Sequence, residues 1–290
     1  MERMISVVIG SLNRRHYLEL TVQTLRKELL SIPGEHEIFV VDGGSDDGTI
    51  EWLITQKDIV SIIQHNRGKW NGVNLPKKSW GYFMNLGFKA STGKYTVMLS
   101  DDCLVVPGAI KNSVIQFESE LQKGNKLGAI AYYWRNWPDM KSYWVGKTLG
   151  GKIFVNHGIY LSSAIKEVNY IDEDNYRFYC GDGDLCLKLW QGGSPVIEAT
   201  NSYIEHFMES SPELRKENNL TYKQDWDNYL EKWKGIFGTT EADANSWIYT
   251  KFSDANETCK LFTQPSKSNY VRAVAKSKLR GIRDLVKNLR

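Results

Sequence analysis

The chain has 290 residues, of which 41% are hydrophobic and 12% aromatic, and its formal net charge is +3. Because this charge is close to zero, we expect no nucleic-acid partner. No apolar run approaches the length of a membrane span, no signal peptide is visible, and the four cysteines include no Cys-x-x-Cys pair. We therefore expect a cytoplasmic protein with free thiols. The aromatic content favours either a full core or the binding of flat groups such as sugar rings.

The first third of the chain alternates between short apolar runs and amphipathic segments. Strands are predicted at residues 5–9, 37–41 and 59–65, and helices at 17–30, 50–55 and 79–90. This β-α-β-α-β order predicts an α/β fold with a mostly parallel sheet and right-handed crossovers. Ser79 would cap the third helix. The polar loop at 66–78 carries Arg67, Lys77 and Lys78, which would either meet phosphate charge or only face solvent.

Two adjacent carboxylates, Asp101 and Asp102, follow a buried strand that we expect at residues 95–99. Burying carboxylates is costly unless a cation is near, and the carboxyl edge of an open α/β sheet is where ligands bind. A hard divalent ion that also binds phosphate oxygens would satisfy both conditions. Taken alone, the pair favours a strand that simply ends in a polar turn, and it is the rest of the chain that favours the ligand site. The loops at 10–15 and 42–49 are expected at the same sheet edge, which is the usual layout of a nucleotide site.

The loop at 42–49 is rich in glycine and acidic residues. It lacks the Gly-x-Gly-x-x-Gly spacing of a dinucleotide site, the Gly-Lys-Ser/Thr of a P-loop and the acidic spacing of an EF-hand. What remains is a tight turn that places Asp42 at the end of a strand. Its carboxylate would either accept hydrogen bonds from a base or a ribose, or only shape the turn before a helix cap.

The second half of the chain has a less regular pattern. It predicts a helix at 109–122, two strands within the aromatic run 130–144, a strand pair at 150–161, an acidic loop at 168–179, a helix at 185–190, short strands at 195–199 and 202–206, and a helix at 220–237. Asp182 and Asp184 stand at a helix start, where the helix dipole favours acidic residues, so capping alone would explain them. His206 alone would fit a structural histidine.

The segment at 270–290 predicts a basic amphipathic helix, whose apolar residues are spaced four and three apart. From residue 271 onward it holds seven basic residues and one acidic residue. Such a helix would lie on an anionic membrane surface, dock on its own domain, or bind a partner.

Four motifs follow one another along the chain: ISVVIGSLNR, VVDGGSDDGT, NLGFKASTGKYTVMLSDD and GDGDLCLKLWQGG, with a histidine after the last. Together they resemble the inverting glycosyltransferases of family 2, over roughly residues 4–235. The resemblance implies the GT-A fold, a Rossmann-like α/β fold with a mostly parallel central sheet flanked by helices. It also implies a UDP- or GDP-sugar donor, Mn²⁺ or Mg²⁺ as cofactor, and transfer by a single displacement.

The resemblance also implies roles for individual residues. Those expected to bind the nucleotide sugar are Ser11, Asn13, Asp42, Asn85, Asp101 and Asp102, to which the basic loop at 66–78 adds Arg67. Asp102 and His206 would hold the metal, and Asp182 would be the general base. A helix start would lower the pKa of Asp182 and keep it ionised. Residues expected on the acceptor side are Asp184, Trp134 and Trp137, although the two tryptophans would equally suit a core.

The sequence departs from the family pattern at two positions. Ser100 stands where the first aspartate of the Asp-x-Asp motif is expected, and Gly181 stands where a glutamate usually precedes the base. The precise metal ligands are therefore left open, with Asp101 or another group assisting Asp102.

We expect a metal-dependent, hexosyltransferase-type enzyme of polysaccharide biosynthesis that acts on a glycan or lipid-linked glycan, at the inner membrane face if the basic helix binds there. Its GT-A domain would span 1–237, with a nucleotide-sugar half at 1–108 and an acceptor half at 109–237, followed by a C-terminal helical extension at 238–290. One alternative is a catalytically inactive sugar- or nucleotide-binding module. The other is a sugar nucleotidyltransferase, although the loop at 10–15 has one glycine and no lysine.

Overall fold

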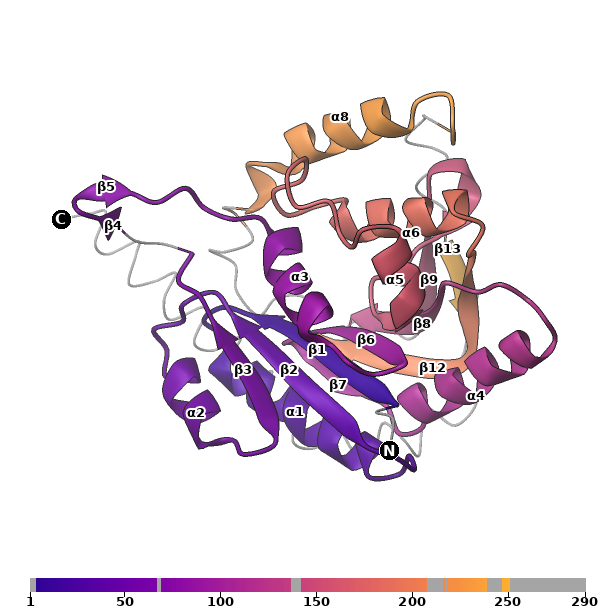
Figure 1. Ribbon diagram of the computed structural model, residues 1–290, viewed down its shortest axis with the longest axis horizontal. Helices are drawn as coiled ribbons and strands as arrows, with labels where there is room; N and C mark the ends of the chain where they lie inside the picture. Colours follow the sequence, from indigo (N-terminus) through magenta and orange to yellow (C-terminus); the bar gives the residue numbers. More distant parts are fainter. Residues whose placement is uncertain are drawn as a thin grey trace.

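The computed structural model describes residues 4–66, 69–136, 142–207, 216, 218–238 and 247–250. These residues form a mixed α/β fold around one curled sheet (Figure 1). The strands of this sheet are β1 (Ile5–Ser11), β2 (His36–Asp42), β3 (Ile59–Ile63), β6 (Tyr95–Ser100), β7 (Cys103–Val105), β8 (Ala129–Asn136), β9 (Tyr143–Thr148), β10 (Lys152–Ile153), β11 (Gly158–Leu161), β12 (Val196–His206) and β13 (Trp247–Thr250). The helices are α1 (Arg15–Leu29), α2 (Thr49–Thr55), α3 (Trp80–Ala90), α4 (Ala109–Gln122), α5 (Ser162–Glu167), α6 (Gly181–Gln191) and α8 (Tyr222–Trp233).

The first four strands of the sheet are parallel, in the order β3-β2-β1-β6. The chain therefore passes from β1 to one side through α1, and later reaches β6 on the other side of β1 through α3. At such a switch point the connections diverge, so the carboxyl ends of β1 and β6 border a crevice. The expected mostly parallel α/β sheet is confirmed, and Ser79 caps α3 by accepting a hydrogen bond from the Tyr82 N–H.

The second half extends this sheet with antiparallel strands and one long parallel strand. β11 lies antiparallel between β6 and β8, while β12 runs parallel to β8 and antiparallel to β7. The sequence predicts two short strands where β12 is continuous, because a register shift between Glu198 and Tyr203 absorbs the polar residues there. This continuity pairs His206 with Cys103, directly beside the acidic turn.

Two apolar layers cover the two faces of the sheet. On one face α1, α2 and α4 contribute side chains such as Leu18, Leu53 and Phe117 to a core with alternate residues of β1. On the other face α3 and α6 pack Phe83 and Leu185 against the remaining strand residues. The alternation along the strands explains why both layers form.

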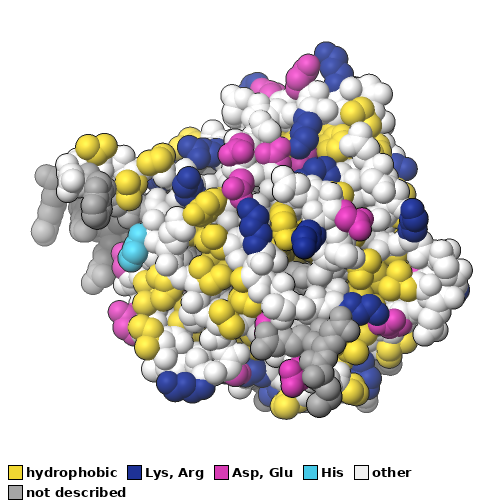
Figure 2. All heavy atoms as spheres, in the orientation of Figure 1, with side chains coloured by type: hydrophobic (Ala, Val, Ile, Leu, Met, Phe, Trp, Pro, Cys, Tyr) yellow, Lys and Arg dark blue, Asp and Glu magenta, His cyan; other side chains and the backbone are white. Residues whose placement is uncertain are grey.

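Several short elements have too few residues to show periodicity and are absent from the sequence-based prediction. They are α5, β13 and the hairpin of β4 (Lys69–Trp70) and β5 (Val73–Asn74). The predicted basic helix at 270–290 lies outside the described residues. Within the described part of the chain, no helix has both the length and the apolar character that a membrane span requires. On the face drawn in Figure 2, basic and acidic side chains of the described residues are interspersed.

Candidate active site

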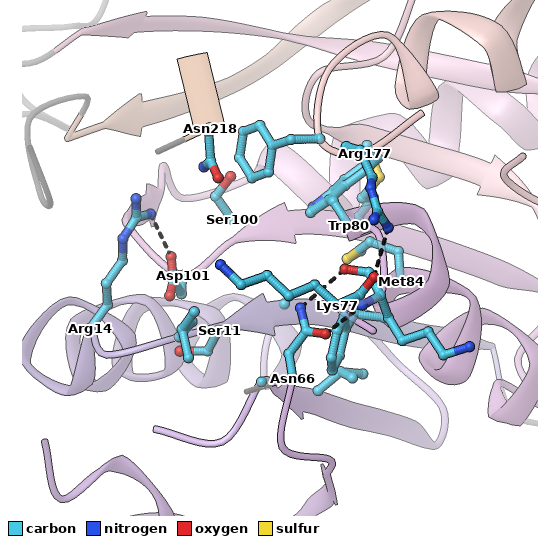
Figure 3. Close-up of a pocket in the computed structure, with 18 of the residues that line it drawn as sticks. Ser11, Arg14, Asn66, Lys77, Trp80, Met84, Ser100, Asp101, Arg177 and Asn218 are labelled. Carbon is cyan, nitrogen blue, oxygen red and sulfur yellow. Dashed lines mark hydrogen bonds and ion pairs between the residues drawn. The ribbon is translucent and has the colours of Figure 1, made fainter. Parts of the chain in front are cut away.

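A cavity of about 510 Å³ opens at the carboxyl ends of β1 and β6. Its size suits a small organic ligand. Ser11, Asn66 and Asp101 line it on the side of the parallel strands, and Arg177 and Asn218 line it on the opposite side (Figure 3). The cavity therefore lies between the two halves of the chain, at the place where the parallel sheet predicts a ligand.

The loops after β1 and β2 are joined by side chains that the sequence assigns to nucleotide binding. The Asn13 N–H donates to Ser45 Oγ at 2.8 Å, and Asn13 Oδ1 accepts from the Asp46 N–H at 2.8 Å. Asp42 is fully buried and accepts hydrogen bonds from the backbone N–H groups of Gly44 and Ser45 and from the Ser45 hydroxyl. Asn13 and Asp42 thus shape the rim, while Ser11 lines the cavity itself. Their contact with a nucleotide stays a prediction.

Asp101 and Asp102 are each only 3% exposed at the end of β6. Arg14 Nη1 lies 3.0 Å from Asp101 Oδ1 and 2.8 Å from Asp102 Oδ2, so one guanidinium contacts both carboxylates. Burial raises the pKa of Asp101 to about 6, with Arg14 acting in the opposite direction. Burial also opposes the charge of Arg14, but the two carboxylates outweigh it and raise the pKa of the guanidinium. The cation that the acidic pair requires is therefore supplied in part by the chain itself.

His206 approaches the second oxygen of Asp102. Its Nε2 lies 3.4 Å from Asp102 Oδ1, while its Nδ1 lies 3.1 Å from Asn136 Oδ1. The two donor atoms are close enough to bind one divalent ion at ~2.0–2.6 Å, and they leave Asp102 Oδ2 to Arg14. In the described ranges no three His, Cys, Asp or Glu side chains are grouped as a metal site. Mg²⁺ sites that substrate phosphates and water complete typically take one or two carboxylates from the protein, and Asp102 supplies one.

Asp182 lies in the first turn of α6, is partly exposed, and reaches the cavity through its contact with Asn156 rather than by lining it. Cys180, which precedes the helix, adopts φ +67°, an uncommon conformation for a residue other than glycine. Asn156, which lines the cavity, donates from Nδ2 to Asp182 Oδ2 at 3.5 Å. The sequence predicts that the helix start lowers the pKa of Asp182, and this is wrong: burial raises the pKa, despite hydrogen bonds from Gly183 and Asn156 that favour the ionised form.

Two other predicted site residues, Asp184 and Asn85, form hydrogen bonds that connect separate elements of the fold. Asp184 is fully buried and accepts from the Tyr176 hydroxyl at 3.0 Å and Trp233 Nε1 at 2.9 Å, and it pairs with Lys232 Nζ at 2.8 Å. Asn85 contacts the chain between β11 and α6 through two hydrogen bonds to Ile171 and one to Glu173. Direct contact of either residue with substrate stays a prediction.

The predicted aromatic residues of the acceptor side are placed differently from one another. Trp134 is 7% exposed and packs against Trp144, with ring centroids 3.7 Å apart, and edge-on against His206. This burial fits the core alternative for Trp134 rather than stacking on a sugar. Trp137 and Arg67 lie outside the described residues.

Among the cavity residues that sequence reasoning missed are Arg14, Asn156 and Arg177. A signal existed for Arg14, since two buried carboxylates require a cation and this arginine follows the neighbouring strand. Asn156 and Arg177 come from irregular segments of the second half, where no periodicity places a side chain.

The sequence matches the model of glycosyl transferase family 2 over residues 6–183, more than half of the chain. The chain belongs to glycosyl transferase family 2. No curated protein matches this family 2 glycosyltransferase. The matched range includes the loop of Ser11, the acidic turn and Asp182, while His206 lies beyond it.

Solved structures share the fold of this glycosyltransferase at low identity. The 1–349 fragment of S. aureus TarS matches with a TM-score of 0.56 and 14% identity, covering 81% of this chain and 67% of the fragment. A longer TarS structure matches with a TM-score of 0.55 and 15% identity, covering 81% of this chain but only 41% of TarS. The Pyrobaculum calidifontis mannosyltransferase PcManGT, solved with GDP-Man and Mn²⁺, matches with a TM-score of 0.55 and 15% identity, over 80% of this chain and 64% of its own. These matches confirm the GT-A fold.

Proposed function

We propose that this protein transfers a sugar from a nucleoside-diphosphate sugar to a hydroxyl of a glycan or lipid-linked glycan, with inversion at the anomeric carbon. One observation carries the proposal. Arg14 and Asp101 of the first half and Asn156 of the second half line the same cavity, and behind them Arg14 contacts Asp102 and Asn156 contacts Asp182. A site for charge on a leaving group and a carboxylate base beside one cavity are what a single displacement needs.

The cavity has cationic groups for a diphosphate. Arg14 lines the cavity beside Asp101, at the left of Figure 3, and the Lys77 side chain extends across the cavity toward Asp101. Structural neighbours solved with UDP-GlcNAc and with GDP-Man support a nucleotide sugar as the donor. Negative charge that develops on the departing diphosphate would be stabilised by these preorganised cations.

Asp102 and His206 would hold a divalent ion, Mn²⁺ or Mg²⁺, with donor atoms 3.4 Å apart. When bound, such an ion adds positive charge beside the diphosphate oxygens. Arg14 contacts the other oxygen of Asp102, so the guanidinium would remain paired with this carboxylate when the ion is bound.

The proton of the acceptor hydroxyl would pass to Asp182. The hydroxyl oxygen forms a bond to the anomeric carbon, the bond from that carbon to the phosphate oxygen breaks, and its electron pair leaves with the diphosphate. Because burial raises the pKa of Asp182, its carboxylate is a stronger base than an exposed aspartate. Asn156 would orient it through the Asp182 Oδ2 contact.

A thermal-shift and turnover experiment tests the proposal. We expect UDP or GDP, and the matching sugar nucleotide, to raise the melting temperature, more so with Mn²⁺, and we expect slow hydrolysis of that donor. Binding without hydrolysis or transfer would instead identify an inactive binding module. Release of pyrophosphate from a nucleoside triphosphate and a sugar 1-phosphate would identify a nucleotidyltransferase. If no nucleotide shifts the melting temperature, the proposal is wrong.

Membrane contact through the predicted basic helix is a separate proposal, and it would place the enzyme at the inner membrane face for polysaccharide biosynthesis. Sedimentation with anionic liposomes tests it, by comparing the full chain with a chain that lacks residues 265–290. Equal binding by both chains would contradict a role for the helix.

A further inference from the structure

An aromatic ridge runs from the cavity onto α8, and we define it as Phe178, Tyr179, Tyr222 and Trp226. Neighbouring rings of the ridge have centroids 5.0, 5.2 and 6.5 Å apart in that order. The rings of Tyr222 and Trp226, four residues apart on the helix, are nearly parallel, at 5°. Phe178 itself lines the cavity, so the ridge continues the site outward.

The ridge combines exposed apolar area with polar groups. Phe178 is 38% exposed and Tyr222 is 46% exposed, and the adjacent Leu220 is 81% exposed. Asn218 and Thr221 line the same wall of the cavity. Aromatic faces flanked by amide and hydroxyl groups match a sugar ring, which has an apolar C–H face and hydrogen-bonding hydroxyls at its edge.

The ridge is held rigidly by Asp225, which is 1% exposed on α8. Its Oδ1 accepts from the Arg177 N–H at 2.7 Å, and its Oδ2 accepts from the N–H groups of Phe178 and Tyr179, both at 2.9 Å. One carboxylate thus ties three consecutive residues of the loop to the helix. A platform ordered before binding loses less entropy when a ligand arrives.

We propose that the aromatic ridge is the acceptor subsite, where a sugar ring of the acceptor glycan stacks on Phe178 and Tyr222. This inference rests on the proposed glycosyl transfer. Phe178 lines the same cavity as Asn156, the hydrogen-bond partner of Asp182, so a glycan seated on the ridge would enter the cavity on the side of the chain that carries the base. Trp134, which the sequence also offers for stacking, is buried.

The test uses the full chain and an array of oligosaccharides of hexoses and N-acetylhexosamines, with Tyr222→Ala, Phe178→Ala and the matched Tyr222→Phe. Ile115→Ala, at a 58% exposed position of α4, is the control for loss of exposed apolar area. We expect at least one glycan class to bind, and each alanine variant to weaken it about tenfold or more. Tyr222→Phe and Ile115→Ala should bind as the wild type does. For a glycan that is also an acceptor, the alanine variants should raise its KM more than they lower kcat.

Other outcomes overturn the inference in distinct ways. If the alanine variants bind glycans like the wild type, the ridge is not the subsite. If no glycan binds although nucleotides still shift the melting temperature, the subsite fails while the proposed function stands. If Tyr222→Ala reduces binding to phosphatidylcholine–phosphatidylglycerol vesicles and leaves glycan binding unchanged, the occupant is a lipid surface. If nucleotides do not shift the melting temperature of the wild type, the proposed function itself is wrong.

Discussion

Burial controls the charge of the residues that we expect to act on the substrate. The same desolvation that makes Asp182 a stronger base also raises the pKa of Asp101, and there it is opposed by Arg14. A helix start contributes less than desolvation does, because the dipole acts over one turn whereas desolvation penalises the ionised form directly. The charge state of each carboxylate in this site therefore depends on the residues packed around it as well as on its position in the helix or turn.

Asp182→Asn should abolish most transfer while leaving donor binding intact. Removal of a general base typically costs about 10²–10⁴-fold in rate, and an amide keeps the shape of the side chain. Initial rates of transfer and nucleotide-induced thermal shifts measure the two properties. Asp174→Asn, at an exposed position of the preceding loop, is the control. If Asp182→Asn transfers sugar at the wild-type rate, Asp182 is not the general base.

Asn156→Ala should move the acid limb of the kcat/KM profile to higher pH. The hydrogen bond from Asn156 favours the ionised form of Asp182, so its loss raises further a pKa that burial has already raised. A base with a higher pKa is protonated, and inactive, up to a higher pH. The wild-type limb should itself lie above about 3.9, the ordinary aspartate value. An unchanged limb in the variant would show that another group controls it.

Arg14→Ala should weaken nucleotide binding and strengthen binding of Mn²⁺ alone. The guanidinium neutralises part of the charge of Asp101 and Asp102, and without it the two carboxylates attract a divalent ion more strongly. Melting temperatures with Mn²⁺, and separately with UDP or GDP, report both effects. Arg15→Ala is the matched control, because Arg15 pairs with Glu19 at the exposed surface. Equal Mn²⁺ shifts in Arg14→Ala and wild type would contradict the charge argument.

At the scale of elements, buried carboxylates attach α8 and the loop before α6 to the rest of the molecule. Asp184 forms an ion pair with Lys232 and accepts a hydrogen bond from Trp233, both on α8. Asp225, on α8 itself, accepts hydrogen bonds from the backbone N–H groups of residues 177–179. Both acidic residues are thus structural in their observed contacts. They position the cavity wall that carries the aromatic ridge and the turn that carries Asp182.

Asp184→Asn should weaken the attachment of α8 by removing the ion pair with Lys232, and so lower the free energy of unfolding. Breaking a buried ion pair costs about 3–5 kcal/mol when one charge is left behind, and less is expected here because the Lys232 side chain is 31% exposed. Denaturant unfolding measures the loss. Lys223→Ala removes a pair with Asp227 on the same helix, where both side chains are exposed, and should change stability by less than about 1 kcal/mol. Equal effects of the two variants would contradict this role of Asp184.

At the scale of the whole molecule, the sheet joins segments that the sequence assigns to different parts of the chain. β13 pairs with β9 over four residues, although residues 247–250 belong to the extension that we predict after residue 237. The domain boundary itself stays a prediction. An edge strand that loses its partner leaves backbone donors and acceptors unsatisfied.

A chain ending at residue 237 should therefore melt at a lower temperature than a chain ending at residue 250. The difference should be about 2–4 °C for each kcal/mol of stability lost. Comparison of these two chains with the full chain separates the contribution of β13 from that of residues 251–290. If the two truncated chains melt together, β13 adds nothing to the sheet and the boundary at 237 gains support.

The amino-acid sequence by itself determined the α/β class, the parallel core and the acidic turn after β6, because strand and helix periods and the motif order are local properties of the chain. It also pointed to Asp182. Only the tertiary structure decided that Arg14 contacts both Asp101 and Asp102, that Asp184 and Trp134 are buried, and that burial raises the pKa of Asp182. These outcomes depend on which distant segments pack together, and desolvation and charge pairing arise from that packing rather than from neighbours in sequence.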